Sequence, residues 1–286
     1  MSTPVVVEQR LPPIVDVTWL HGRIASDPTL VLCHVGSTMT GSDPAAEFEQ
    51  RHLPGARFLS LDDALAGVPS GTAGRHPLPS PEAFAAALGA AGVGDGATVV
   101  AYDDRGGAHA SRLVWMLRII GRPAALLDGG LDAWDGALER GRVTPDPVDR
   151  TTRDWPRDVL ADATDVVDHI ANGGVVIDSR DAVRYRGELE PIDPVAGHVP
   201  GAVNVPFADN LTADGRFHAA EALTARFEPV VGDDARPVVY CGSGVTACHN
   251  ALALERAGLG LPRVYVGSWS GWIADPDLPI ATGPTP

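Results

Sequence analysis

The chain has 286 residues, and its 37 acidic and 22 basic side chains give a formal net charge of −15. All 22 basic positions are arginine, so the protein lacks the lysine that a Schiff base or a P-loop requires. The acidic balance argues against binding to bulk nucleic acid. The length and the 44% content of hydrophobic residues predict a globular protein of two domains.

Short apolar runs rich in β-branched residues alternate with helical patterns along the chain. This alternation predicts an α/β fold of mainly parallel sheets flanked by helices, with ligands bound beyond the carboxyl ends of the strands. In chain order, we expect a strand at 30–35, a helix at 81–91, a strand at 98–102, a helix at 108–120, a strand at 175–178, a helix at 219–227, a strand at 237–240, a helix at 245–257 and a strand at 263–266.

Two parts of the sequence resemble each other. The segment HLPGA begins at His52 and HVPGA begins at His198, an offset of 146. An offset of 138 places Tyr102 on Tyr240 and also aligns a glycine and a tryptophan further along each half. The two offsets differ by a loop-length change of eight residues. We interpret the pattern as a tandem duplication.

Cys241 is predicted to lie where a strand ends and a helix begins, a position at which parallel sheets bind ligands. The glycines that follow allow a tight loop with inward-pointing N–H groups, and the helix adds the positive end of its dipole. We expect the pKa of a cysteine there to be lowered, which makes it a nucleophilic thiolate. The alternative is a small buried core residue. A cysteine phosphatase would need arginine at position 247, which is Ala247 here.

The offset of 138 puts Asp103 where Cys241 stands, so the first half lacks the nucleophile. Residues 141–156 are rich in proline and charge, as exposed linkers are. We therefore predict a catalytically inactive N-terminal domain at 1–140, a linker at 141–156 and a catalytic domain at 157–286.

This chain resembles the two-domain rhodanese-type sulfurtransferases, and the resemblance covers nearly the whole chain. The motifs that carry it are the Cys241 loop, the two HxPGA segments, Asp178-Ser179-Arg180 and Gly267-Ser268-Trp269. The resemblance implies an inactive first domain and an active second domain of rhodanese-like fold. It also implies that the active-site cysteine carries a persulfide between a sulfur donor and an acceptor. The loop residues around the donor sulfur are then Gly242, Gly244, Val245 and Thr246.

Within that family the loop sequence differs with the donor. The loop of thiosulfate-type members is similar to Cys-Arg-Lys-Gly-Val-Thr. The loop of 3-mercaptopyruvate-type members is similar to Cys-Gly-Ser-Gly-Val-Thr, which is the sequence found here. The resemblance to the second group also implies a proton relay of a serine, a histidine and an aspartate. The matching positions in this chain are Ser243, His76 and Asp62. From the residues alone, His76 could be a solvated loop histidine and Asp62 a helix N-cap.

Without lysine, an anionic donor must be held by arginine and backbone N–H groups. Arg184 matches the family's carboxylate-binding arginine, and the alternative is a surface salt bridge. Eukaryotic members of the family have a stretch similar to Thr-Glu-Pro-Glu-Pro-Arg, whose arginine is a second anchor for the donor. Residues 188–194 of this chain lack that arginine. Arg186 and Arg75 are the candidates to replace it.

The sequence therefore predicts a sulfurtransferase that moves sulfane sulfur from 3-mercaptopyruvate to a thiol, thioredoxin, sulfite or cyanide through Cys241. Thiosulfate:cyanide sulfur transfer is the enzymatic alternative, and a noncatalytic sulfur-carrier or interaction module is the alternative from another class. The nine histidines show no metal spacing and no dinucleotide motif is present, so we expect neither a metal nor an organic cofactor. The partners expected are a small-molecule donor and a thiol or thioredoxin-like acceptor.

Nucleic acid and membrane are not expected partners. Three cysteines, Cys33, Cys241 and Cys248, are too few for a disulfide scaffold and favour a reducing, cytoplasmic setting. Residues 1–20 lack the basic and apolar regions of a signal peptide, and no apolar run reaches 18 residues. The sequence thus predicts neither export nor a membrane span.

Overall fold

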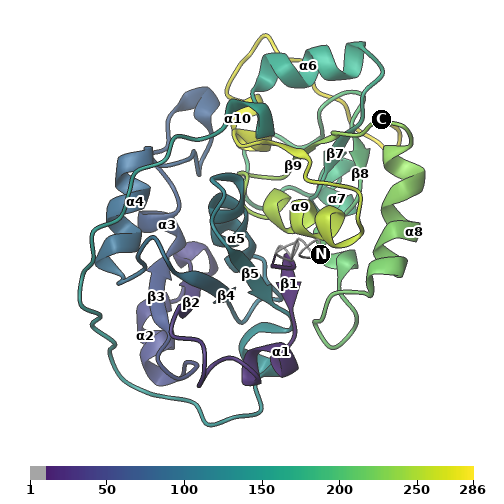
Figure 1. Cartoon of the computed structure of the whole chain (residues 1–286). Coiled ribbons are helices and arrows are strands. Elements are labelled where there is room, and N and C mark those ends of the chain that lie inside the picture. The colour runs from purple at the N-terminus through teal and green to yellow at the C-terminus, as the bar shows by residue number, and fades with distance from the viewer. Residues whose placement is uncertain (1–10) are drawn as a thin grey trace, which may run out of the picture.

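A computed structural model describes residues 11–286 (Figure 1). The first ten residues of the predicted N-terminal domain, which are also part of the segment tested for a signal peptide, lie outside the described residues. Among the helices of the described part, none is both long and apolar enough to cross a bilayer.

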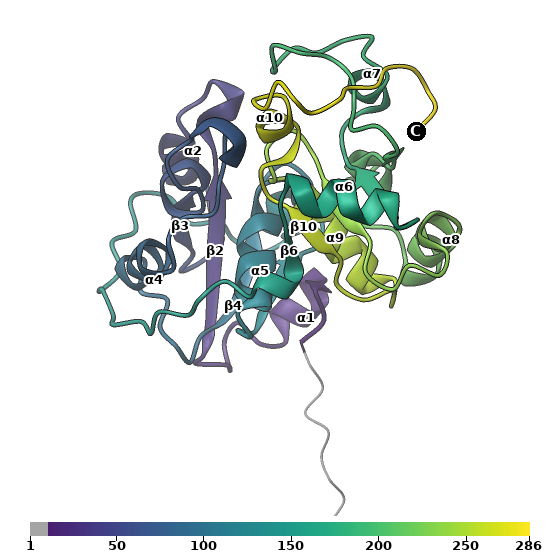
Figure 2. The same cartoon turned by 90° about the horizontal axis from the view of Figure 1, so that it is seen from above.

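The N-terminal half contains a parallel five-stranded sheet of strand order β1-β5-β4-β2-β3. Helices cover both faces of this sheet (Figures 1 and 2). The strands are β1 (Ile14–Val15), β2 (Leu30–Gly36), β3 (Arg57–Ser60), β4 (Thr98–Tyr102) and β5 (Ala124–Leu127). The helices are α1 (Val17–His21), α2 (Pro44–Gln50), α3 (Leu61–Ala64), α4 (Pro81–Ala90) and α5 (Ala110–Ile119).

The C-terminal half has a second parallel sheet, of order β6-β10-β9-β7-β8. Its strands are β6 (Leu160–Ala161), β7 (Val176–Asp178), β8 (Val203–Asn204), β9 (Val238–Tyr240) and β10 (Arg263–Tyr265). Its helices are α6 (Ala163–Ala171), α7 (Ala182–Tyr185), α8 (Ala220–Val231), α9 (Ala247–Arg256) and α10 (Ser268–Trp272). Short 3₁₀ turns occupy Thr38–Thr40, Gly71–Ala73, Gly130–Ala133, Arg157–Val159 and Phe207–Asn210.

The two sheets have the same topology, with β4 in one at the place of β9 in the other. The tyrosine that ends each of these strands makes the same contact. The hydroxyl of Tyr102 accepts a hydrogen bond from the Leu53 N–H at 3.0 Å, and that of Tyr240 accepts one from the Val199 N–H at 3.2 Å. The predicted α/β fold of two domains with parallel sheets flanked by helices is confirmed.

Each strand and helix predicted from the sequence is present. The bounds differ most at α8, and α5 and α9 each begin two residues later than predicted. α8 continues to Val231, four residues beyond the prediction, because Val231 is buried against the core on the helical face that Leu223 and Phe227 share. α9 begins at Ala247 rather than at 245, because the loop after Cys241 turns at Gly244 with a φ of 78° before the helix starts.

Residues 141–156 contain no helix or strand and run along the N-terminal half (Figure 1). The Val148 N–H donates to the Gly89 carbonyl at 3.0 Å. The Trp155 indole N–H donates to the Pro79 carbonyl at 2.9 Å, and its ring lies 5.2 Å from that of Phe84. The predicted linker is therefore held against one half by specific contacts.

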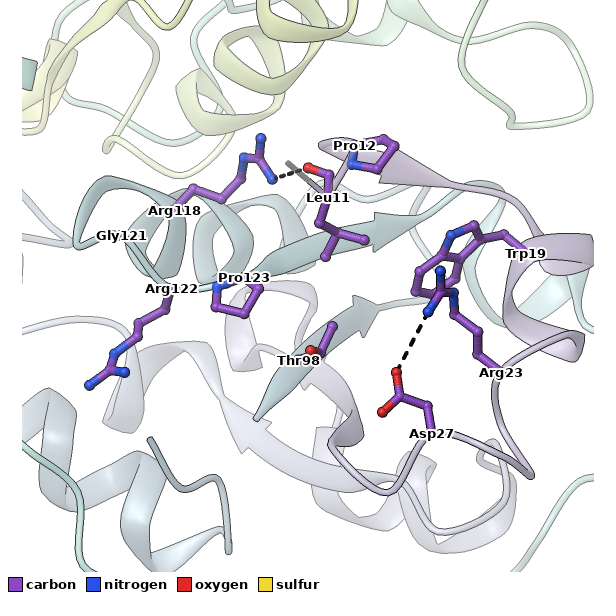
Figure 3. Close-up of a pocket in the computed structure, with 10 residues that line it drawn as sticks. All are labelled: Leu11, Pro12, Trp19, Arg23, Asp27, Thr98, Arg118, Gly121, Arg122 and Pro123. Carbon is purple, nitrogen blue, oxygen red and sulfur yellow. Dashed lines mark hydrogen bonds and ion pairs between the residues drawn. The ribbon is translucent and has the colours of Figure 1, made fainter. Parts of the chain in front are cut away.

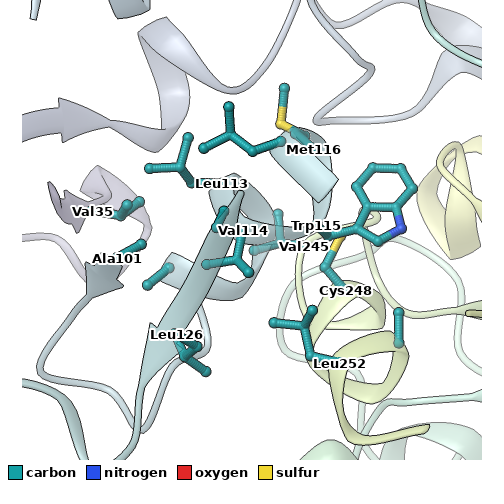
Figure 4. Packing of buried hydrophobic residues seen from close by; sticks show 14 of the residues in the cluster. Val35, Ala101, Leu113, Val114, Trp115, Met116, Leu126, Val245, Cys248 and Leu252 are labelled. Atoms are coloured by element: carbon teal, nitrogen blue, oxygen red, sulfur yellow. The ribbon is translucent and has the colours of Figure 1, made fainter. Parts of the chain in front are cut away.

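The two halves share one hydrophobic core, in which α5 packs against α9 (Figures 1 and 2). Leu113 to Met116 of α5 lie beside Val245, Cys248 and Leu252 (Figure 4). Cys248 is fully buried there and is part of this core. This packing brings α5 of the first half to the Cys241 loop of the second half.

Candidate active site

Cys241 directly follows β9, a central strand of the C-terminal sheet, and its side chain lies in a loop closed by backbone contacts. The Gly244 N–H donates to Cys241 Sγ at 3.1 Å. Glycine is required at 244, because a Cβ atom there would lie 2.5 Å from the Val266 carbonyl oxygen. Cys241 is only 2% exposed, so burial alone does not distinguish a nucleophile from a core residue. The N–H group directed at sulfur is what favours an anionic sulfur.

The segment that follows β10 supports this loop from the other side. The Cys241 N–H donates to Ser268 Oγ at 3.1 Å, and the hydroxyl of Ser268 donates to the Tyr265 carbonyl at 2.9 Å. Ser268 has a φ of 52°, a left-handed conformation that is unusual outside glycine. The Trp269 and Ser270 N–H groups donate to the carbonyls of Cys241 and Gly242, both at 2.9 Å. The loop geometry therefore depends on α10 as well as on its own sequence.

The three residues of the predicted relay lie next to one another, although they come from both halves. His76 Nδ1 lies 2.8 Å from Ser243 Oγ, and His76 Nε2 lies 3.5 Å from Asp62 Oδ1. His76 is 8% exposed and is therefore not a solvated loop histidine. Ser60, not Asp62, is the N-cap of α3. The geometry excludes both structural alternatives from the sequence and leaves the relay as a prediction.

The protonation of this group follows from its surroundings. Burial, assisted by the positive charges of Arg112 and Arg75, lowers the pKa of His76 to about 4. Burial acts to raise the pKa of Asp62, but hydrogen bonds from Thr38 outweigh it and hold that pKa below its usual value. At neutral pH the imidazole is therefore neutral beside a carboxylate. A proton on Nε2 facing Asp62 leaves Nδ1 free to accept the Ser243 hydroxyl proton.

Two arginines lie beside the Cys241 loop. A Cβ atom at Gly242 would be 3.3 Å from Arg75 Nη2 and 3.5 Å from Arg184 Nη2. Arg75 comes from the N-terminal half, from the residue before His76. Arg186, the other candidate for a second anchor, pairs with Glu188 at 2.7 and 2.8 Å. These contacts favour Arg75 as the second anchor.

Carboxylates neutralise these arginines within the chain. Arg184 Nη2 bonds to Glu190 at 2.7 Å and to Asp193 at 3.1 Å, and Arg75 Nη1 bonds to the other oxygen of Asp193. Burial raises the pKa of Asp193. The cluster holds three positive and three negative side chains: Arg75, Arg180, Arg184, Asp178, Glu190 and Asp193. No motif in the sequence indicates a role for Glu190 and Asp193, since they lie in the segment that departs from the family pattern.

The corresponding loop of the N-terminal half contains a carboxylate in place of the thiol. Asp103 follows β4 as Cys241 follows β9, and it is fully buried. Its carboxylate accepts four hydrogen bonds of 2.8 to 2.9 Å, from the N–H groups of Arg105, Gly107, His109 and Ala110. The first half thus retains an anion-binding loop and fills it with its own side chain.

A surface hollow of about 1090 Å³ lies elsewhere (Figure 3). Its lining includes Thr98, which begins β4, and Pro123, which precedes β5. It therefore lies at the amino ends of these strands, opposite the edge that carries Asp103, and the sites of parallel sheets lie at carboxyl ends. Residues 11–286 contain no group of three metal-ligating side chains that could hold an ion.

Known proteins resemble this chain over most of its length. The family model of the rhodanese-like domain matches residues 25–137 and again residues 162–275. A protein of Pseudomonas aeruginosa named "Probable 3-mercaptopyruvate sulfurtransferase" is 44% identical over 92% of this chain and 96% of its own length. A protein of Mycobacterium tuberculosis named "Putative thiosulfate sulfurtransferase SseB" is 38% identical over 92% of this chain and 95% of its own. The crystal structure of SseA from Escherichia coli, described with the 3-mercaptopyruvate sulfotransferases, superposes with a TM-score of 0.77 at 31% identity, covering 91% of this chain and 99% of SseA.

Proposed function

This chain belongs to the family of proteins built from rhodanese-like domains, and we propose that it is a sulfurtransferase that takes sulfane sulfur from 3-mercaptopyruvate onto Cys241. The observation that carries the proposal is the 2.8 Å contact between Ser243 of the Cys241 loop and His76 of the other half. In the same loop, the Gly244 N–H faces the Cys241 sulfur. The loop offers backbone N–H groups and a hydroxyl but no charged side chain. It therefore suits a donor with one carboxylate and a thiol.

In the first half-reaction, the Cys241 thiolate attacks the sulfur of the donor. The carbon–sulfur bond breaks, its electron pair goes to carbon, and pyruvate leaves as the enolate. The enolate takes the hydroxyl proton of Ser243, and the proton of the donor thiol replaces it on the hydroxyl, with Nδ1 of neutral His76 accepting it in between and Asp62 holding the Nε2 proton in place. The loop N–H groups stabilise the persulfide that remains. In the second half-reaction, an acceptor thiolate attacks the outer sulfur and releases Cys241, which gives ping-pong kinetics.

The donor carboxylate binds between Arg184 and Arg75 and takes the place of Asp193 on them. We expect Arg184→Gln to raise the KM for 3-mercaptopyruvate by about 10- to 100-fold, because a charge-assisted hydrogen bond is lost. We expect Asp193→Asn to lower that KM, because an internal competitor for both arginines loses its charge. Steady-state kinetics at saturating acceptor measure both. Arg186→Gln is the matched comparison, and a KM effect as large as that of Arg184→Gln would move the second anchor to Arg186.

The relay predicts a defined rate and pH dependence for persulfide formation. Ser243→Ala should slow it by about 100-fold in single-turnover experiments, the usual contribution of a proton-transfer group. His76 accepts a proton only when neutral, and its pKa is lowered to about 4. The ratio of wild-type to Ser243→Ala rates should therefore stay constant as the pH falls through 6.5 and decrease only near pH 4. A ratio that does not decrease even below pH 4 would remove His76 from the relay, whereas a midpoint near 6.5, the ordinary pKa of histidine, would show that its pKa is not lowered.

Thiosulfate:cyanide sulfur transfer is the second candidate, since the Mycobacterium tuberculosis relative is named for thiosulfate. The two donors are compared by kcat/KM, with Cys241→Ala as the background. We expect 3-mercaptopyruvate to be preferred, and a clear preference for thiosulfate would reverse the assignment. A noncatalytic sulfur carrier would turn over neither donor without a protein partner, so turnover by the purified chain excludes it.

A thiol or a thioredoxin-like protein is the acceptor we propose, and the cytoplasm is the proposed location. All three cysteines are free and buried, which suits a reducing compartment. We further propose that the two domains, 1–140 and 157–286, arose by duplication and that only the second has kept a nucleophile. Their shared strand order and the Asp103 loop support this.

A further inference from the structure

Arg112 lies on α5 of the N-terminal half, yet its guanidinium reaches the Cys241 loop of the other half. Nη1 donates to the Gly244 carbonyl at 2.7 Å, and Nη2 donates to the His76 carbonyl at 2.8 Å. Nε donates to the Leu65 carbonyl at 3.2 Å, and the side chain is fully buried. One side chain thus connects the segment of the relay histidine to the loop of the nucleophile.

Within the described part of the chain, no carboxylate pairs with the positive charge of Arg112. Within residues 11–286 its partners are backbone carbonyls and the thiol of Cys248. Burial lowers its pKa, but a guanidinium stays protonated in proteins. A buried ion without a counter-ion costs stability. By contrast, Arg118, six residues further along α5 and also buried, is neutralised by Glu255 at 2.9 Å.

A negative charge on Cys241 would balance this buried cation. Gly244 stands between the two groups: its N–H donates to Cys241 Sγ, and its carbonyl accepts from Arg112. The two side chains also interact electrostatically. We propose that Arg112 is a positioning residue for Cys241, which holds the Gly244 and His76 carbonyls in place and supplies the positive charge that favours the thiolate and the persulfide anion. The persulfide part of this inference rests on the proposed function.

The test separates charge from packing with two variants of the full chain. Arg112→Lys keeps the charge, whereas Arg112→Gln keeps hydrogen-bond donors and loses the charge. The readout is the pH midpoint of Cys241 alkylation by iodoacetamide, assigned to Cys241 by peptide mass spectrometry. We expect Arg112→Gln to move the midpoint up by about one pH unit and to slow persulfide formation at pH 7 about tenfold. We expect Arg112→Lys to keep the wild-type midpoint.

Arg118→Gln is the matched control, because it removes a buried arginine from the same helix away from the loop. It should lower the unfolding temperature and leave the alkylation midpoint unchanged. The proposal is overturned if Arg112→Gln keeps the wild-type midpoint, or if the lysine and glutamine variants shift it equally. Alkylation needs no sulfur donor, so these results stand even if the protein turns over no 3-mercaptopyruvate, an outcome that would count against the proposed function alone.

Discussion

Cys241→Ser is expected to abolish sulfur transfer, with a loss of kcat/KM on the order of 10⁴-fold or more, as for other nucleophiles that form a covalent intermediate. The serine hydroxyl is not ionised at neutral pH and cannot hold a sulfane sulfur. The Gly244 N–H and the Ser243–His76 contact remain in this variant, but they have no reacting sulfur to act on. The assay is pyruvate release from 3-mercaptopyruvate with a thiol acceptor.

Cys33→Ala is the matched control for that loss. Cys33 is a buried thiol of the first half, and burial raises its pKa to about 12, so it is protonated and unreactive at neutral pH. We expect its replacement to leave turnover within a few-fold of wild type. Residual turnover by Cys241→Ser at more than a hundredth of the wild-type rate would show that another group carries the sulfur.

Asp103→Ala is expected to destabilise the protein by about 4 kcal/mol or more, one of the largest effects of a single substitution. It leaves four N–H groups without their acceptor, of which those of Gly107 and Ala110 are buried and those of Arg105 and His109 partly buried, and each unpaired buried donor costs about 1–3 kcal/mol. The effect should be large even though we propose no part for Asp103 in the chemistry. Urea unfolding of the full chain, followed by circular dichroism, measures it.

Asp104→Ala is the control for this substitution, because Asp104 is the exposed neighbour in the same loop. Its loss should change the stability by less than about 0.5 kcal/mol. Asp103→Asn, which keeps one acceptor oxygen, should fall between the two. Equal stabilities for Asp103→Ala and Asp104→Ala would show that the loop does not depend on its internal anion.

The sequence was sufficient for the parts of the fold that have a local signal. Runs of β-branched residues located β2, β4 and β9, and the position after β9 identified Cys241. The edge strands β1 and β6 have two residues each, too few for any periodicity. Their pairing with β5 and β10 is a tertiary effect.

In the candidate site too, only some of the residues have a local signal in the sequence. His76 and Asp62 were identified only through the family resemblance, because the contact of His76 with Ser243 joins residues 167 apart in the sequence. Arg112 was not identified, because its partners are mainly backbone carbonyls, which have no sequence signature. Asp193 was not identified for a different reason. Its importance comes from the arginines that it neutralises, and those contacts are formed only in the folded protein.

The measurement that tests the central claim most directly is the mass of the intact protein after treatment with 3-mercaptopyruvate, followed by peptide mapping. We predict one added sulfur atom on Cys241 of the wild type, its removal by a thiol acceptor, and none on Cys241→Ala. An unchanged wild-type mass, or a sulfur found on Cys33 or Cys248 instead, would contradict the account.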